Sequence, residues 1–115
     1  MKVYIEGHSY TVDNFESDST QVINFIQKIP ASVAVERGLI EDSADLRPET
    51  LVTVNEGTTN EELLKVLIDR TQYLQAKFPC RENAIAITKM EEALLWFDKR
   101  TADRKARNVE GKQLA

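Results

Sequence analysis

The sequence predicts an α+β protein, in which a small N-terminal antiparallel β element is followed by a long antiparallel two-helix hairpin. Two observations predict this class. Residues 1–57 contain short runs of alternating or β-branched residues separated by turn residues, whereas the apolar period becomes helical from residue 58 onward. At 115 residues, 42% of them hydrophobic, the chain is expected to be a single domain, with residues 58–111 forming the hairpin.

The first β element is expected close to the N-terminus. Residues 2–6 alternate between polar and apolar, residues 7–9 are turn residues, and the alternation resumes at Tyr10 and Val12. This arrangement predicts a β-hairpin. Residues 20–29 are rich in β-branched and aromatic residues and are interpreted as a further strand, although a short amphipathic helix fits the same spacing.

The rest of the N-terminal part is expected to contain one more strand. Pro30 is expected to end the element before it. Residues 31–49 show little periodicity and are expected to be irregular. Residues 51–54 are expected to form a short strand, which the turn residues 55–57 close.

Two amphipathic helices are predicted from residue 58 onward. Two capping boxes, one residue apart, are available to start the first helix: Thr58 with Glu61, and Thr59 with Glu62. The helix is expected to end near Lys77, because Pro79 disfavours helical geometry at the residue before it. The connector is short, so a second helix beginning near Glu82 is expected to return antiparallel to the first.

The second helix carries a heptad seam that is apolar in its middle and polar at both ends. The members of this seam are Asn83, Ile87, Met90, Leu94, Phe97, Thr101 and Arg104. Its centre is expected to pack against another helix, whereas its polar ends need partners of their own. Leu95 and Trp96 lie off the seam, and their burial requires the β element or another subunit.

Charge is unevenly distributed along the chain. The net charge is -4, yet residues 99–107 carry five basic residues against Asp103, and residues 36–69 carry nine carboxylates against three basic residues. Net acidity argues against sequence-independent binding of duplex nucleic acid. The acidic stretch is interpreted either as a solvated surface or as a pole that attracts the basic end of a neighbouring copy.

The cellular location is expected to be the cytoplasm. No apolar run approaches the roughly 20 residues that a membrane span needs, and the N-terminus lacks the long apolar segment of a secretion signal. Cys80 is the single cysteine, so neither an intrachain disulfide nor a cysteine-based metal site is expected. No cofactor is expected either.

Catalysis is not expected, and the chain is predicted not to be an enzyme. His8, the one histidine, falls in a predicted turn and is interpreted as a surface residue. Cys80 precedes a helix and is interpreted as a small flanking residue rather than a reactive thiolate. Glu91 and Glu92 are adjacent on a helix and therefore point in different directions. Neither a phosphate-binding glycine loop nor a nucleophile motif is present.

Binding of an anionic ligand is better supported. Arg100 and Arg104 lie one helical turn apart, and their guanidinium groups can hold a pyrophosphate or two bridged phosphates. Tyr73 offers an aromatic face to a base, and Asn83 offers an amide to a base edge or a ribose hydroxyl. A favourable interaction of the arginines with the helix C-terminal dipole is the competing explanation.

Spacing predicts that these residues meet only between subunits. Asn83 and Tyr73 lie near the connector, whereas Arg100 and Arg104 lie about 26 to 32 Å further along the second helix, at about 1.5 Å per residue. Two subunits packed antiparallel would place the arginines of one copy beside Tyr73 and Asn83 of the other. A homo-oligomer with composite sites is therefore expected.

Residues 60–111 contain three distinctive motifs: the PCREN connector, the T-x-x-E-E-A-L-x-W core of the second helix and the R-T-x-x-R-x-x-x-x-V-E-G ending. With these motifs the region resembles the helical hairpin of two phage immune-evasion families, the Thoeris anti-defence sponges and the anti-CBASS cyclic-dinucleotide sponges. The preceding β element looks like the Thoeris type, because the other family is essentially all helical.

The resemblance implies sequestration of a signal in the cytoplasm of an infected bacterium. The signal would be a cyclic ADP-ribose isomer with a glycosidic link between its two riboses, bound without being degraded. By this resemblance the ligand contacts fall on Tyr73, Asn83, Arg100 and Arg104, and less securely on Thr101 and Arg47. Some members also bind cyclic dinucleotides at this site, and cyclic trinucleotides at a separate site of a hexamer.

Three other functions stay open at this point. The chain could be a cyclic-dinucleotide sponge directed only against CBASS, or a phage assembly or interaction protein that oligomerises and binds no nucleotide. A nucleic-acid binder using the basic helix end would bind oligonucleotides with an affinity that falls steeply with salt.

Overall fold

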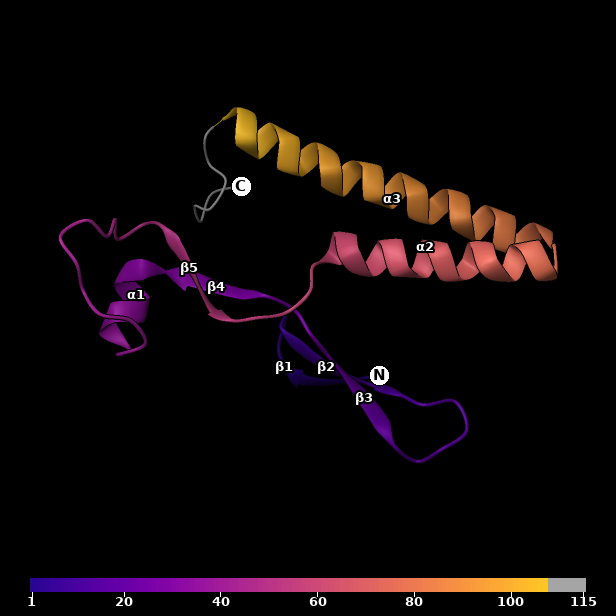
Figure 1. The fold of residues 1–115 in the computed structure, drawn as a ribbon, viewed down its shortest axis with the longest axis horizontal. Helices are drawn as coiled ribbons and strands as arrows, with labels where there is room; N and C mark the ends of the chain where they lie inside the picture. Colours follow the sequence, from indigo (N-terminus) through magenta and orange to yellow (C-terminus); the bar gives the residue numbers. More distant parts are fainter. Residues whose placement is uncertain (108–115) are drawn as a thin grey trace. The chain divides into compact units, whose positions relative to one another are not determined.

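The structure, a computed structural model, describes residues 1–107 and has the expected α+β class (Figure 1). The element order is β1 (Lys2–Ile5), β2 (Ser9–Asp13), β3 (Thr20–Asn24), β4 (Gln27–Pro30), α1 (Ala31–Glu36), β5 (Leu51–Asn55), α2 (Asn60–Lys77) and α3 (Arg81–Ala106). These residues form two compact units, residues 1–58 and residues 59–107. The expected end of the hairpin at residues 108–111 lies outside the described residues.

Strands β1, β2 and β3 form an antiparallel sheet in that order, which confirms the predicted N-terminal hairpin. Its turn is closed by the His8 amide, which donates to the Ile5 carbonyl at 3.0 Å, and Gly7 has the positive φ of 76° that the turn requires. Tyr10 lies in the central strand and meets the Phe25 ring edge-to-face at 5.8 Å. Strand β2 is therefore the central strand of this sheet.

Residues 20–29 do not form the single strand that was predicted. They divide into β3 and β4, which belong to two different sheets, and Thr58 forms an isolated bridge with Phe25 at the junction. The Thr58 amide donates to the Asn24 carbonyl at 2.8 Å, and the Ile26 amide donates to the Thr58 carbonyl at 3.0 Å. Strand β4 then pairs antiparallel with β5, which confirms the strand expected at residues 51–54.

Gly57 is expected to be intolerant of any side chain. A Cβ at this position would lie 2.4 Å from the Phe25 carbonyl carbon and 2.5 Å from the Asn24 carbonyl oxygen, both of them backbone atoms. We therefore expect Gly57→Ala to lower the free energy of opening of the β2–β3 amides by about 1–3 kcal/mol, measured by hydrogen exchange. Glu56→Ala, at the exposed neighbouring residue, is the control, and equal exchange in the two variants would contradict the close approach.

Helix α1 corrects the prediction that residues 31–49 are irregular. Its six residues bury Ala31 and Ala34, and the Ala31 amide donates to the Thr50 carbonyl at 2.8 Å. Pro30 immediately precedes the helix, and Gly38 follows it with a φ of 72°, so both ends carry ordinary helix signals. The helix is too short for its apolar period to show in the sequence. Residues 37–49 are irregular, as expected.

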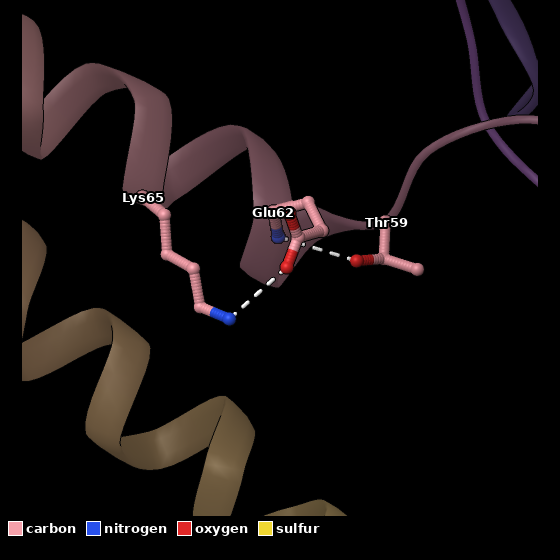
Figure 2. Close-up of polar contacts among 3 residues, drawn as sticks. All are labelled: Thr59, Glu62 and Lys65. Carbon is pink, nitrogen blue, oxygen red and sulfur yellow. Dashed lines mark hydrogen bonds and ion pairs between the residues drawn. The ribbon is translucent and has the colours of Figure 1, made fainter.

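Helices α2 and α3 form the predicted antiparallel hairpin. The predicted seam is the face of α3 that is least exposed: Ile87, Met90, Leu94 and Phe97 are half-buried, and Ile68 of α2 is buried. Of the two candidate N-cap residues, the structure uses Thr59. The Thr59 hydroxyl accepts a hydrogen bond from the Glu62 amide at 3.2 Å, and the Glu62 carboxylate accepts one from Lys65 at 3.0 Å (Figure 2).

Helix α3 is longer than α2. It has 26 residues against 18, a difference of eight residues or about 12 Å at the rise of an α-helix. The hydrogen bond to Glu62 raises the pKa of Lys65, and the negative charge of Asp98 acts in the same direction across the hairpin. The end of α3 extends past the start of α2 (Figure 1). We call residues 99–107 the basic overhang.

Candidate functional site

At the connector end of the hairpin, Tyr73 presents an accessible aromatic ring. Its side chain is 51% exposed and lies on α2 one turn before the helix ends. The Lys77 ammonium lies 4.8 Å from the centroid of the Tyr73 ring, which is within the range of a cation–π contact. One face of the ring is therefore covered by a positive charge in the free protein.

Asn83 lies at the same end, in the first turn of α3. Its backbone amide donates to the Cys80 sulfur at 3.4 Å, and the Cys80 amide donates to the side-chain oxygen of Gln75 at 3.0 Å. Cys80 thus caps α3, which agrees with its interpretation as a helix-flanking residue. The cap uses the backbone of Asn83, so its half-buried side-chain amide makes none of these hydrogen bonds.

A shallow hollow of about 580 Å³ runs along α2 from its first turn to Tyr73. It is lined by Glu62, Lys65, Val66, Asp69, Arg70 and Tyr73. The lining combines an aromatic ring and an aliphatic side chain with charges of both signs. Sequence reasoning did not identify this hollow.

The basic overhang carries the predicted phosphate contacts. Arg100 is exposed, Thr101 is half-buried and Arg104 is buried, with 9% of its surface accessible. Arg100 also borders a small hollow of about 200 Å³ on the outer face of α3, together with Trp96, Lys99, Asp103 and Arg107. Lys99 is engaged by Asp103 at 2.9 Å. The negative end of the helix dipole adds to the stabilisation of these cations.

Arg47, the remaining predicted contact, belongs to the unit formed by residues 1–58. It is exposed and lies in the irregular segment before β5, where its carbonyl accepts a hydrogen bond from the Thr50 amide at 3.1 Å. The backbone there is held in a turn, and the guanidinium group faces solvent.

The structure brings the predicted contacts together in two groups rather than one. Tyr73 and Asn83 lie at the connector, whereas Arg100, Thr101 and Arg104 lie on the overhang. Helix α3 is uninterrupted between Asn83 and Arg100, so 17 residues separate them by about 26 Å. A small ligand cannot touch both groups within one hairpin.

The residues weighed for catalysis lie in both units: His8 in residues 1–58, and Cys80, Glu91 and Glu92 in the hairpin. His8 is half-buried in the β1–β2 turn, and Glu92 forms an ion pair with Lys89 at 3.7 Å. Within residues 1–107, no three side chains of histidine, cysteine, aspartate or glutamate are grouped so that they could hold a metal ion. The helices of this described part are too short or too polar to cross a membrane.

Comparison with known proteins gives the family. The protein family described as Acb2/Tad1, hairpin domain, matches residues 41–102, which is more than half of the chain. The chain belongs to the Acb2/Tad1 hairpin family. Its relative Thoeris anti-defense 1 from Bacillus phage SBSphiJ7 is 59% identical over 56 residues. That alignment covers 48% of this chain and 39% of the relative, so the chain spans about two-fifths of the relative's length.

The match to the Acb2/Tad1 hairpin covers α2, the connector and most of α3. Tyr73, Asn83, Arg100, Thr101 and Arg47 lie inside it, and Arg104 lies two residues beyond. The matched region therefore contains both residues of the connector group, and Arg100 and Thr101 of the overhang group.

Proposed function

We propose that this chain is a phage anti-defence sponge, which binds a cyclic ADP-ribose isomer made by bacterial Thoeris systems and does not degrade it. The observation that carries the proposal is the division of the family hairpin into an aromatic and amide group at one end and an arginine group at the other. A relative whose name is Thoeris anti-defense 1 shares 59% identity with part of this chain.

The chemistry of the two groups matches the two halves of such a ligand. The Tyr73 ring can stack on the base, and the Asn83 amide can bond to a base edge or a ribose hydroxyl. Arg100 and Arg104 can hold the diphosphate through charge-assisted, two-pronged hydrogen bonds. Thr101 and Arg47 are secondary contacts in this proposal.

The proposed site is shared between two copies of the chain. Antiparallel packing of two hairpins would bring the basic overhang of one copy to the connector end of the other, which closes the gap of about 26 Å. Leu95 and Trp96, which are 67% and 70% exposed, offer apolar surface for such packing. Each dimer would then hold two equivalent sites, and dimers could assemble further into a hexamer.

Titration separates the proposed function from its alternatives. We expect the cyclic ADP-ribose isomer to bind in calorimetry, and expect 100 times its dissociation constant to stabilise the protein against heat by about 2.7 kcal/mol. Binding of cyclic dinucleotides alone would indicate a sponge directed against CBASS. A protein that binds neither class, nor cyclic trinucleotides, would be an assembly or interaction protein.

Sequestration also predicts that the ligand survives. After prolonged incubation with the protein at stoichiometric concentration, the isomer should be recovered intact when the protein is denatured, as measured by liquid chromatography and mass spectrometry. Free ligand kept in buffer for the same time is the control. Product that accumulates with time only in the presence of protein would show hydrolysis and contradict the sponge mechanism.

A further inference from the structure

Tyr73 lies between the hollow, whose other lining residues precede it on α2, and the Lys77 ammonium, which follows it. Lys77 lies one turn after Tyr73 and covers one face of its ring at 4.8 Å. The other residues that line the hollow all precede Tyr73: Asp69 and Arg70 lie one turn before it, and Val66 lies two turns before. Helical side chains lean toward the N-terminus, so the ring lies over the turn that carries Asp69 and Arg70.

Both charged groups of that turn are available to a ligand. Among residues 1–107, neither Asp69 nor Arg70 forms an ion pair or a side-chain hydrogen bond, and both are exposed. Asp69 is about 6 Å from Tyr73 along the helix axis, a distance that a base lying against the ring would span. The positive charge of Arg70 offsets the negative charge of Asp69, so an anionic ligand is not repelled from the hollow.

We propose that this hollow is the base subsite, in which Asp69 selects a base that carries an exocyclic amine, such as adenine. This inference rests on the proposed function and extends it to the choice of base. The base lies on the face of the Tyr73 ring that Lys77 leaves open. An ionised carboxylate only accepts hydrogen bonds, so Asp69 binds an amine that donates and repels a carbonyl at the same position.

Lys77 has a separate part in this arrangement. Its ammonium holds one face of the Tyr73 ring and thereby directs the base to the other face. Lys77 is a positioning residue, because its effect on the base is exerted through Tyr73. It should influence affinity without influencing the choice between bases.

The test compares the cyclic ADP-ribose isomer with its hypoxanthine counterpart, in which a carbonyl replaces the adenine amine. By calorimetric titration, we expect the wild-type protein to bind the adenine ligand at least tenfold more tightly. Asp69→Ala should weaken the adenine ligand about tenfold and bring the two affinities close together. Asp69→Asn should bind both ligands and reduce the preference for adenine, because its amide can donate to the carbonyl or accept from the amine.

Glu62→Ala is the matched control. Glu62 lines the same hollow, but it lies 11 residues before Tyr73, about 16 Å along the axis. Removing a carboxylate near an anionic ligand should by itself raise affinity slightly, so a fall at position 69 alone identifies a hydrogen bond. Lys77→Met should weaken both ligands by the same few-fold factor and leave their ratio unchanged.

The outcomes separate this inference from the function on which it rests. In the first outcome, the wild-type protein binds tightly and both Asp69 variants keep the same preference between the two bases. That result would contradict the proposed base subsite but not the proposed sponge function. Binding of neither ligand to the wild-type protein would overturn the proposed function itself. Circular dichroism and thermal unfolding of each variant show that the fold is retained before binding is compared.

Discussion

Substitution Arg100→Ala is expected to weaken binding of the cyclic ADP-ribose isomer by about 1.5–3 kcal/mol, which corresponds to roughly 10- to 150-fold in the dissociation constant. The guanidinium group of Arg100 is exposed on the basic overhang, where it can form two hydrogen bonds to a phosphate. Its removal should change the free energy of unfolding little, because the side chain is exposed to solvent and is not part of a core. Calorimetric titration measures the loss directly.

Lys99→Ala is the control for the effect of charge alone. It removes one positive charge from the same turn of α3, but Lys99 is already engaged by Asp103 at 2.9 Å and lacks the planar fork of an arginine. An equal loss in the two variants would show that the overhang acts through its overall field. Unchanged affinity in Arg100→Ala would remove this residue from the site. Arg104→Ala is less informative, because Arg104 is buried and its loss also affects stability.

Mixing two defective chains is expected to restore strong binding. In the proposed dimer, each site takes Tyr73 from one copy and Arg100 from the other. A heterodimer of Tyr73→Ala and Arg100→Ala chains therefore has one site with both lesions and one site with none. We expect up to half of the sites in that heterodimer to regain wild-type affinity, measured as the stoichiometry of the tight phase in a calorimetric titration.

The complementation experiment depends on exchange of subunits, which native mass spectrometry of differently labelled chains establishes first. Each variant alone, at the same total concentration, is the control and should show weak sites only. Complete exchange without any tight sites would contradict a composite site. The ligand would then have to bind within a single hairpin.

The hairpin could be predicted from the sequence because its signals are local. The capping residue Thr59, the apolar seam and the break at Pro79 all act within one or two turns of helix. The division of residues 20–29 into two strands could not be predicted in this way. It depends on hydrogen bonds that Thr58 donates to Asn24 and accepts from Ile26, both more than 30 residues away from it in the sequence.

The candidate site shows the same division between local and tertiary information. Helical spacing places Tyr73, Asn83 and Arg100 correctly on their helices, and the separation between the groups follows from the rise of α3. The contact between Lys77 and Tyr73 follows the same i, i+4 rule and was missed. The hollow beside Tyr73 depends on side-chain conformations, which spacing does not give. The proposed ligand rests on the family resemblance and not on helical spacing.

The uninterrupted course of α3 also sets how neighbouring sites influence one another. In the proposed dimer, this helix is a rigid spacer that holds the two sites about 26 Å apart. Electrostatic repulsion between two bound anions decays over about 8 Å at physiological ionic strength, so the first ligand barely affects the second. Without electrostatic coupling, the two sites would fill independently, and free signal would accumulate only once the amount of signal exceeds the number of sites.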